Sequence, residues 1–241
     1  MERFYLNQLI VPTKRIYIEG ELNENIIIED KLYNYIKNVL KLNKDEYIYV
    51  LNNKNIGIFK IAEIKKGKII IKKNSDRPLQ GIPYRLTIYQ AILKREYMDN
   101  IVEKSGELGI TKFIPVYTAR CQSDINKNTM RRFKDLIIKG ALQSELEYIP
   151  EIIEPINLED IVVENKQNFL FYEKCNEKSL PKIKVKDISL FIGPEGGLEK
   201  HEIDYLKDRG FQIISPTSSI LKAETAAIVF IGIIKILMEL S

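Results

Sequence analysis

The first seventy residues alternate between apolar and polar positions with the two-residue period of β-strands. Residues 47–51 and 56–64 show it most clearly, and shorter patterns at 15–19 and 68–72 predict two further strands. Asp30 is suited to cap a helix between them. The apolar positions of that helix share one face, at Leu32, Ile36, Val39 and Leu40. Short strands with one inserted helix predict a small β-barrel.

Beyond residue 83 the pattern changes to regular alternation of strands and helices. The predicted strands are 86–92, 113–117, 168–172, 188–192 and 211–214. The predicted helices are 96–108, 130–141, 199–209 and 224–240. Such β/α alternation is typical of a parallel sheet with helices on both faces, an α/β fold. We therefore expect two domains, 1–73 and 84–241, joined by a turn-rich linker at 74–83.

The last helix is apolar on nearly all of its faces. Such a helix has to be buried on several sides, either in the core of the sheet layer or in a subunit interface. Both alternatives are open from the sequence. Lys235 interrupts the apolar run from Ala226 well before the roughly 18 residues of a membrane span. We expect no membrane association.

Composition is that of an ordinary globular protein of 241 residues, with 45% apolar residues. Cys121 and Cys175 lack the spacing of metal ligands and predict neither a metal site nor a disulfide framework. They fit a reducing cytosol, and the first residues do not form a signal peptide. The net charge of +4 is compatible with RNA binding without indicating it.

The most informative segment is a hydrophobic strand that runs into a glycine turn, the sequence FIGPEGG at 191–197. A second segment, ILKAETA at 220–226, leads into the last helix. Glycines let a ligand approach the backbone closely and leave successive N–H groups free to converge on it. The spacing differs from the dinucleotide-binding fingerprint, and the chain contains no phosphate-binding GxxxxGK[ST] loop.

Together these two segments resemble the SPOUT methyltransferases, and in particular the RsmE family, which methylates N3 of a uridine in small-subunit ribosomal RNA. Further segments resemble the same family over almost the whole chain. They are Arg3-Phe4 and the residues at 39–42, 94–98, 103–110 and 150–152. The GPEGG and ILxxETA pair is specific, and the other segments are supportive.

The resemblance implies a PUA-like β-barrel that binds RNA, followed by a knotted (trefoil) α/β methyltransferase domain. It implies a cytoplasmic homodimer that pairs through its C-terminal helices and acts on 16S ribosomal RNA in the small subunit. It also implies that S-adenosylmethionine binds at the two loops. The residues expected to contact the cofactor are Ile192, Gly193, Pro194, Gly196, Gly197, Ser215, Ile220, Leu221, Ala223 and Thr225.

Methylation of a uridine N3 requires the loss of a weakly acidic proton, so a base or a cation that stabilises the anion would help. Glu195 and Glu224 are the candidate bases, and Lys222, where the family usually has arginine, is the candidate cation. Each glutamate has a structural alternative. Glu195 can satisfy free N–H groups at a helix start, and Glu224 with Thr225 can cap the last helix. His201 is expected on an exposed helix face without a chemical role.

Candidates for phosphate contacts with RNA are basic residues on both domains. They are Arg3, Lys14, Arg15, Lys94, Arg95 and Arg120. Tyr33 and Tyr35 are candidates for stacking on a base, or else half-buried helix residues.

One departure from the family concerns Leu142 and Leu146, which stand where relatives usually carry glutamate and arginine. It leaves two alternatives beside the uridine methyltransferase: an enzyme that modifies another ribosomal or transfer RNA nucleotide, and a non-catalytic RNA-binding assembly factor.

Overall fold

The computed structural model describes residues 14–121, 123–172, 180–215, 217 and 219–241. The chain divides into two compact units, Met1–Gln80 and Gly81–Ser241. The division falls within the segment 74–83 that the sequence predicts as a linker. Residues 74–78 are nevertheless the end of a strand, because their backbone continues the antiparallel ladder with the preceding strand as far as Pro78.

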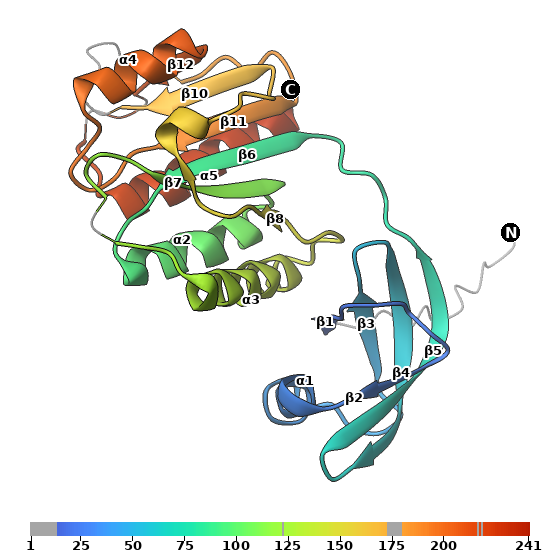
Figure 1. Cartoon of the computed structure of the whole chain (residues 1–241). Coiled ribbons are helices and arrows are strands. Elements are labelled where there is room, and N and C mark those ends of the chain that lie inside the picture. Colours follow the sequence, from blue (N-terminus) through green and yellow to red (C-terminus); the bar gives the residue numbers. More distant parts are fainter. Residues whose placement is uncertain (1–13, 122, 173–179, 216, 218) are drawn as a thin grey trace, which may run out of the picture. The chain divides into compact units, whose positions relative to one another are not determined.

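The first unit is a five-stranded sheet in the spatial order β1-β3-β4-β5-β2 (Figure 1). Its strands are β1 (Arg15–Tyr17), β2 (Asn25–Ile28), β3 (Tyr47–Leu51), β4 (Asn55–Lys65) and β5 (Lys68–Pro78). β1 and β3 pair in parallel, and the other neighbours are antiparallel. Ile16, Ile48, Phe59, Ile61, Ile69 and Ile71 are fully buried in its core.

The helical segment of this unit differs from the prediction. It consists of α1 (Asp30–Asn34) and a π-helical stretch, Tyr35–Leu40. Glu29 occupies the N-cap position, and Asp30 is the first helical residue, with a φ of 53°. The wider π-helical turn shifts the face that a 3.6-residue period predicts. As a result Ile36 is buried as expected, whereas Val39 is 64% exposed.

The second unit is built on a sheet in the order β12-β10-β11-β6-β7-β8, with β9 also paired to β7. All its ladders are parallel. The strands are β6 (Arg85–Ala91), β7 (Lys112–Tyr117), β8 (Glu151–Ile152), β9 (Ile156–Asn157), β10 (Gln167–Phe171), β11 (Asp187–Ile192) and β12 (Phe211–Ile214).

Four α-helices and one 3-10 turn of this unit lie within the described residues. They are α2 (Arg95–Glu107), α3 (Lys127–Gln143), η2 (Leu158–Asp160), α4 (Lys200–Asp208) and α5 (Ala223–Leu240). Gly109 and Gly210 follow α2 and α4 with φ angles of 71° and 86°. Glycine in this left-handed conformation ends a helix, and the predicted helices 96–108 and 199–209 stop just before these two residues.

Successive strand residues point to opposite faces of the sheet, and each face has its own core. Leu86 and Ile88 of β6, with alternate residues of β10 and β11, pack against α2, α3 and α5. Tyr89 and Phe191 lie on the other face, with α4 and the segment around η2. The predicted α/β arrangement, with helical structure on both faces of a parallel sheet, is therefore confirmed.

Helix α5 buries one of its faces in the first of these cores, through Ala227, Phe230, Ile231 and Ile234. Its other face is open within the described chain, where Val229, Ile236 and Leu240 are exposed. Burial in the sheet layer therefore accounts for one face of this apolar helix and leaves the other uncovered. Among the described residues, no helix is long and apolar enough to cross a membrane.

Helices α2 and α3 approach one another closely at two glycines. A Cβ atom added to Gly140 would lie 2.1 Å from the carbonyl oxygen of Glu103, and one added to Gly106 would lie 2.5 Å from that of Ile137. Real Cβ atoms do not come so close to backbone atoms. The two helices can pack at this distance only because both positions lack a side chain.

Gly140→Ala is expected to force these helices apart and to lower the free energy of unfolding by about 1–3 kcal/mol, the usual cost of overpacking a core. Urea denaturation measures the change. Gly81→Ala is the matched control, because a Cβ at Gly81 would meet no atom within 4 Å. Equal stability of both variants would contradict the close approach.

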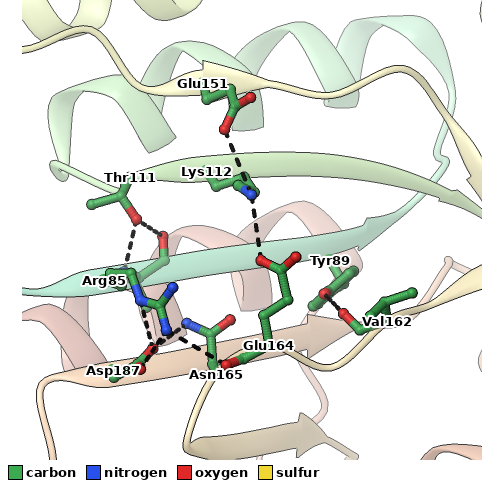
Figure 2. A network of polar contacts seen from close by, with 10 residues as sticks. Arg85, Tyr89, Thr111, Lys112, Glu151, Val162, Glu164, Asn165 and Asp187 are labelled. Atoms are coloured by element: carbon green, nitrogen blue, oxygen red, sulfur yellow. Dashed lines mark hydrogen bonds and ion pairs between the residues drawn. The ribbon is translucent and has the colours of Figure 1, made fainter.

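Polar side chains join the amino ends of β6, β7 and β11 to the segment that crosses them (Figure 2). Arg85 donates to both carboxylate oxygens of Asp187, at 3.1 and 2.6 Å, and Asn165 donates to the same carboxylate at 2.7 Å. Lys112 lies 3.6 Å from Glu151 and 3.7 Å from Glu164. We call these six residues the amino-end clamp. It fixes the 151–165 segment to the end of the sheet opposite the candidate site.

The stabilisation that this clamp provides depends on pH through Asp187. Desolvation raises the pKa of its carboxyl group, but hydrogen bonds from Arg85 and Asn165 outweigh it and hold the pKa below the usual value. A depressed folded-state pKa stabilises the protein above the unfolded value of about 3.9, and this contribution is lost as pH falls through the folded value.

Asp187→Asn is therefore expected to lower the free energy of unfolding at pH 7 by about 1.5–3 kcal/mol, the value of hydrogen bonds to a charged group. The difference from the wild type should shrink as pH falls from about 4 through the lower folded pKa, because the wild-type carboxyl group is then progressively protonated. Urea denaturation at pH 7 and pH 3 measures both effects, with exposed Asp204→Asn as the control. A difference independent of pH would contradict the role of the charge.

Candidate active site

A pocket of about 640 Å³ opens at the carboxyl ends of β10 and β11. In parallel α/β sheets, ligands bind outside the carboxyl ends of the strands. Three segments contribute most of the wall: the end of β10, the loop after β11 and the start of α5. The lining residues are Lys94, Tyr97, Phe171, Tyr172, the stretch 192–198, the stretch 220–224 and Ala226.

The loop at 193–197, which we call the glycine loop, makes a tight turn as it leaves β11. The amide of Gly197 donates to the carbonyl oxygen of Pro194 at 2.9 Å, and Gly197 has a φ of 69°. In the described part of the chain, the amides of Glu195 and Gly196 have no hydrogen-bond acceptor. They leave donors available at the pocket wall.

Glu195 connects the glycine loop to α2. Its Oε1 accepts a hydrogen bond from the amide of Lys94, the N-cap residue of α2, at 3.3 Å. The sequence allows Glu195 to satisfy a free N–H group at the start of a helix. Glu195 does so here, but the helix is α2, which lies far from residue 195 in sequence. The side chain is exposed and also lines the pocket, so the contact leaves its other oxygen available.

The second loop ends at the N-terminus of α5. Lys222 is the N-cap residue of that helix, and no side chain caps it. Glu224 and Thr225 are the second and third helical residues, so the alternative reading of this pair as the N-cap is wrong. Lys222 is exposed and Glu224 half-buried, and both line the pocket. A cation and a carboxylate thus share one wall with the positive end of a helix dipole.

Eight of the ten residues predicted to contact a cofactor line this pocket. Ser215 and Thr225 are not among the lining residues: Ser215 is fully buried after β12, and Thr225 is exposed on α5. Ile220 lines the pocket but is 86% exposed, so little protein covers it. Leu221 is half-buried and packs against the core.

Five pocket residues are absent from the sequence prediction: Tyr97, Phe171, Tyr172, Leu198 and Ala226. Phe171 ends β10 and Tyr172 follows it, so the rule that ligands bind at carboxyl ends of strands is the signal that would have found them. Phe171 also stacks on Phe230, with ring centroids 3.7 Å apart. Tyr97 lies in the first turn of α2, and its position follows only from the packing of that helix.

The candidate RNA contacts are placed in different ways. Lys14 donates to the carbonyl oxygen of Leu40, and the Arg15 guanidinium lies 4.9 Å from the centre of the Tyr49 ring. Arg95 is exposed and 4.0 Å from Asp99. Arg3 lies outside the described residues.

Of the other two basic candidates in the second unit, one lines the pocket and the other contacts the glycine loop. Lys94 lines the pocket, and Arg120 donates to the carbonyl oxygen of Gly196 at 2.6 Å. Arg120 thus binds the backbone of the glycine loop, whereas phosphate contacts by either residue stay a prediction.

The two candidate stacking residues differ in exposure. Tyr33 is buried, and its hydroxyl accepts from Lys37 at 3.0 Å, whereas Tyr35 is 37% exposed. His201 is exposed and 3.3 Å from Glu199, on the helix face where the sequence predicts it. In the part of the chain that the structure describes, no three His, Cys, Asp or Glu residues gather as a metal site. Leu142 and Leu146 do not line the pocket.

Comparison with known proteins agrees with this architecture. Residues 80–235 match the RNA methyltransferase domain, and residues 28–74 match the RNA methyltransferase PUA domain. The second unit is therefore an RNA methyltransferase domain of the SPOUT type, and the first carries a PUA domain. These matches define the class of protein.

Curated relatives identify the family within that class. Ribosomal RNA small subunit methyltransferase E from Rickettsia conorii is 31% identical over 236 residues, which cover 92% of this chain and 95% of the relative. The protein of the same name from Aquifex aeolicus is 29% identical over 203 residues, covering 81% and 88%. The chain belongs to the ribosomal RNA small subunit methyltransferase E (RsmE) family.

A solved structure supports the same assignment. A methyltransferase from Legionella pneumophila, determined in complex with the cofactor S-adenosylmethionine, superposes with a TM-score of 0.85 at 26% identity. The superposition covers 94% of this chain and 98% of that one. The similarity extends through both units.

Proposed function

We propose that this protein transfers a methyl group from S-adenosylmethionine to N3 of a uridine in the decoding region of 16S ribosomal RNA. The observation that carries the proposal is the pocket, where the glycine loop meets the 220–224 loop at the start of α5. Two further facts support it: relatives across the whole chain are named for the small ribosomal subunit, and the Legionella neighbour holds the cofactor.

The residues of the pocket fit S-adenosylmethionine. Ile192, Leu198 and Leu221 offer an apolar wall for the adenine ring, as nucleoside pockets require. The free amides of the glycine loop can bind polar groups of the cofactor, and the carboxylates of Glu195 and Glu224 suit a sulfonium cation. The cofactor supplies a methyl group that the positive sulfur already activates, so the protein has mainly to position the two reactants.

Lys222 is the residue that we assign to stabilise the uridine anion. When N3 loses its proton, negative charge spreads to the flanking carbonyl oxygens, and a cation beside them lowers the barrier. Lys222 is exposed at the pocket wall, and its side chain has no hydrogen bond or ion pair in the described part of the chain. Its ammonium group is therefore available to a substrate.

Glu224 is the better candidate for the proton acceptor. Glu195 already accepts the Lys94 amide through Oε1, whereas Glu224 has no such partner among the described residues and follows Lys222 on the same wall. Tyr97 and Tyr172 are half-buried in the pocket and can stack on an unpaired base, the usual way in which proteins recognise single-stranded RNA.

The knot, the dimer and the location in the cytoplasm belong to the proposal as well. The exposed apolar side chains of α5, Val229, Ile236 and Leu240, support pairing of two copies through this helix. The RNA methyltransferase PUA domain match supports RNA binding by the first unit.

Transfer of labelled methyl groups tests the proposed function. The purified protein is incubated with labelled S-adenosylmethionine and small ribosomal subunits that lack the uridine methylation, with transfer RNA in parallel. We expect label in the 16S RNA at N3 of one decoding-region uridine. Label in transfer RNA alone would show that the substrate is transfer RNA, the alternative raised by Leu142 and Leu146. No label in either RNA would contradict the proposal.

Lys222→Ala is expected to lower the single-turnover rate about 10²- to 10³-fold, the usual loss for one group that stabilises a developing anion. Its affinity for S-adenosylmethionine should stay close to that of the wild type. Rapid-quench kinetics and titration calorimetry measure the two quantities. Lys207→Ala, an exposed lysine in the last turn of α4, is the control. An unchanged single-turnover rate would remove Lys222 from the mechanism.

A further inference from the structure

The glycine loop has little restraint of its own. In the described structure its internal backbone hydrogen bonding is the single contact from Gly197 to Pro194. Glycine also adopts more backbone conformations than any other residue, which makes a loop of this composition intrinsically mobile. The loop can present its amides in one arrangement only if neighbouring segments hold it.

Arg120, in the turn that follows β7, contacts the loop directly. Its Nη1 donates to the carbonyl oxygen of Gly196 at 2.6 Å. Its aliphatic carbons lie along the same residue, because a Cβ added to Gly196 would be 3.2 Å from the Cδ of Arg120. The side chain therefore both packs against this peptide and fixes the direction of its carbonyl group.

A buried carboxylate in turn fixes the segment that carries Arg120. Glu202 of α4 is 2% exposed, and each of its oxygens accepts one backbone amide at 2.8 Å: Oε1 from Ala119 and Oε2 from Glu199. The Nε of Arg120 also lies 3.7 Å from Oε1 of Glu199. Glu202 thus ties the turn after β7 to the start of α4, which follows the glycine loop in sequence.

We propose that Arg120 is a positioning residue of the cofactor site, which holds the glycine loop in its binding conformation from a turn that Glu202 anchors. The proposal rests on the proposed function, because it takes S-adenosylmethionine as the ligand of the loop. It replaces a phosphate contact as the main role of Arg120: the guanidinium is already engaged with a backbone carbonyl, although its side chain is 49% exposed.

Cofactor affinity measured without RNA separates the two roles. Titration calorimetry with S-adenosylmethionine is expected to show about ten- to hundredfold weaker binding for Arg120→Ala, because a hydrogen bond from a charged group is lost. Arg120→Lys should recover part of the affinity, since lysine keeps the charge without the planar fork. Glu202→Gln should also weaken binding, because a carboxamide has one acceptor oxygen for two amides. Arg131→Ala, an exposed arginine on α3, is the matched control and should bind like the wild type.

Hydrogen exchange of the free protein supplies a readout without cofactor. The amide of Gly197, which donates the internal hydrogen bond of the loop, should exchange faster in Arg120→Ala than in Arg131→Ala, while thermal stability changes little. Unchanged affinity and unchanged exchange in Arg120→Ala would overturn the proposal. A higher KM for RNA with unchanged cofactor affinity would also overturn the proposal, and would indicate that Arg120 binds phosphate. A wild-type protein that fails to bind the cofactor would contradict the proposed function, and the exchange rates would still test the positioning.

Discussion

The candidate site depends on how the glycine loop is held as it leaves the sheet. The loop follows a strand that is buried from Ile188 to Ile192. Three contacts from other segments reach the loop or its flanks: Arg120 on the Gly196 carbonyl, Lys94 on the Glu195 carboxylate, and Glu202 between the neighbouring turn and α4. The amino-end clamp fixes the opposite end of the same strands. A rigid parallel sheet between these two ends lets a loop of permissive residues keep one conformation.

The regular elements of the second unit could be predicted because their periodicity is strong. Its long strands and helices begin and end within a few residues of the expected positions, and the glycines after α2 and α4 stop both helices. β8 and β9 are too short to show a period, and β2, with the sequence NIII, does not alternate. The π-helical stretch in the first unit breaks the period on which the prediction for Val39 rested. The crossing of α2 and α3 at Gly106 and Gly140 depends on tertiary packing, which a single sequence does not display.

The site was predictable where chemistry is concentrated in one contiguous segment. The glycine loop and the 220–224 loop both line the pocket as expected. Residues brought in by tertiary packing were harder to identify: Tyr97 comes from a helix start, and Ser215, close to the second loop in sequence, is buried away from the pocket wall. Arg120 was singled out for its charge. Its contact with Gly196 joins segments 76 residues apart and could not be inferred from local pattern.

A crystal structure of the protein with S-adenosylmethionine is the most direct test of the account. We predict that the cofactor lies between the glycine loop and the 220–224 loop, with Arg120 still bound to the Gly196 carbonyl and Lys222 facing the methyl group. Cofactor bound elsewhere on the chain, or a glycine loop released from Arg120 in the complex, would contradict it.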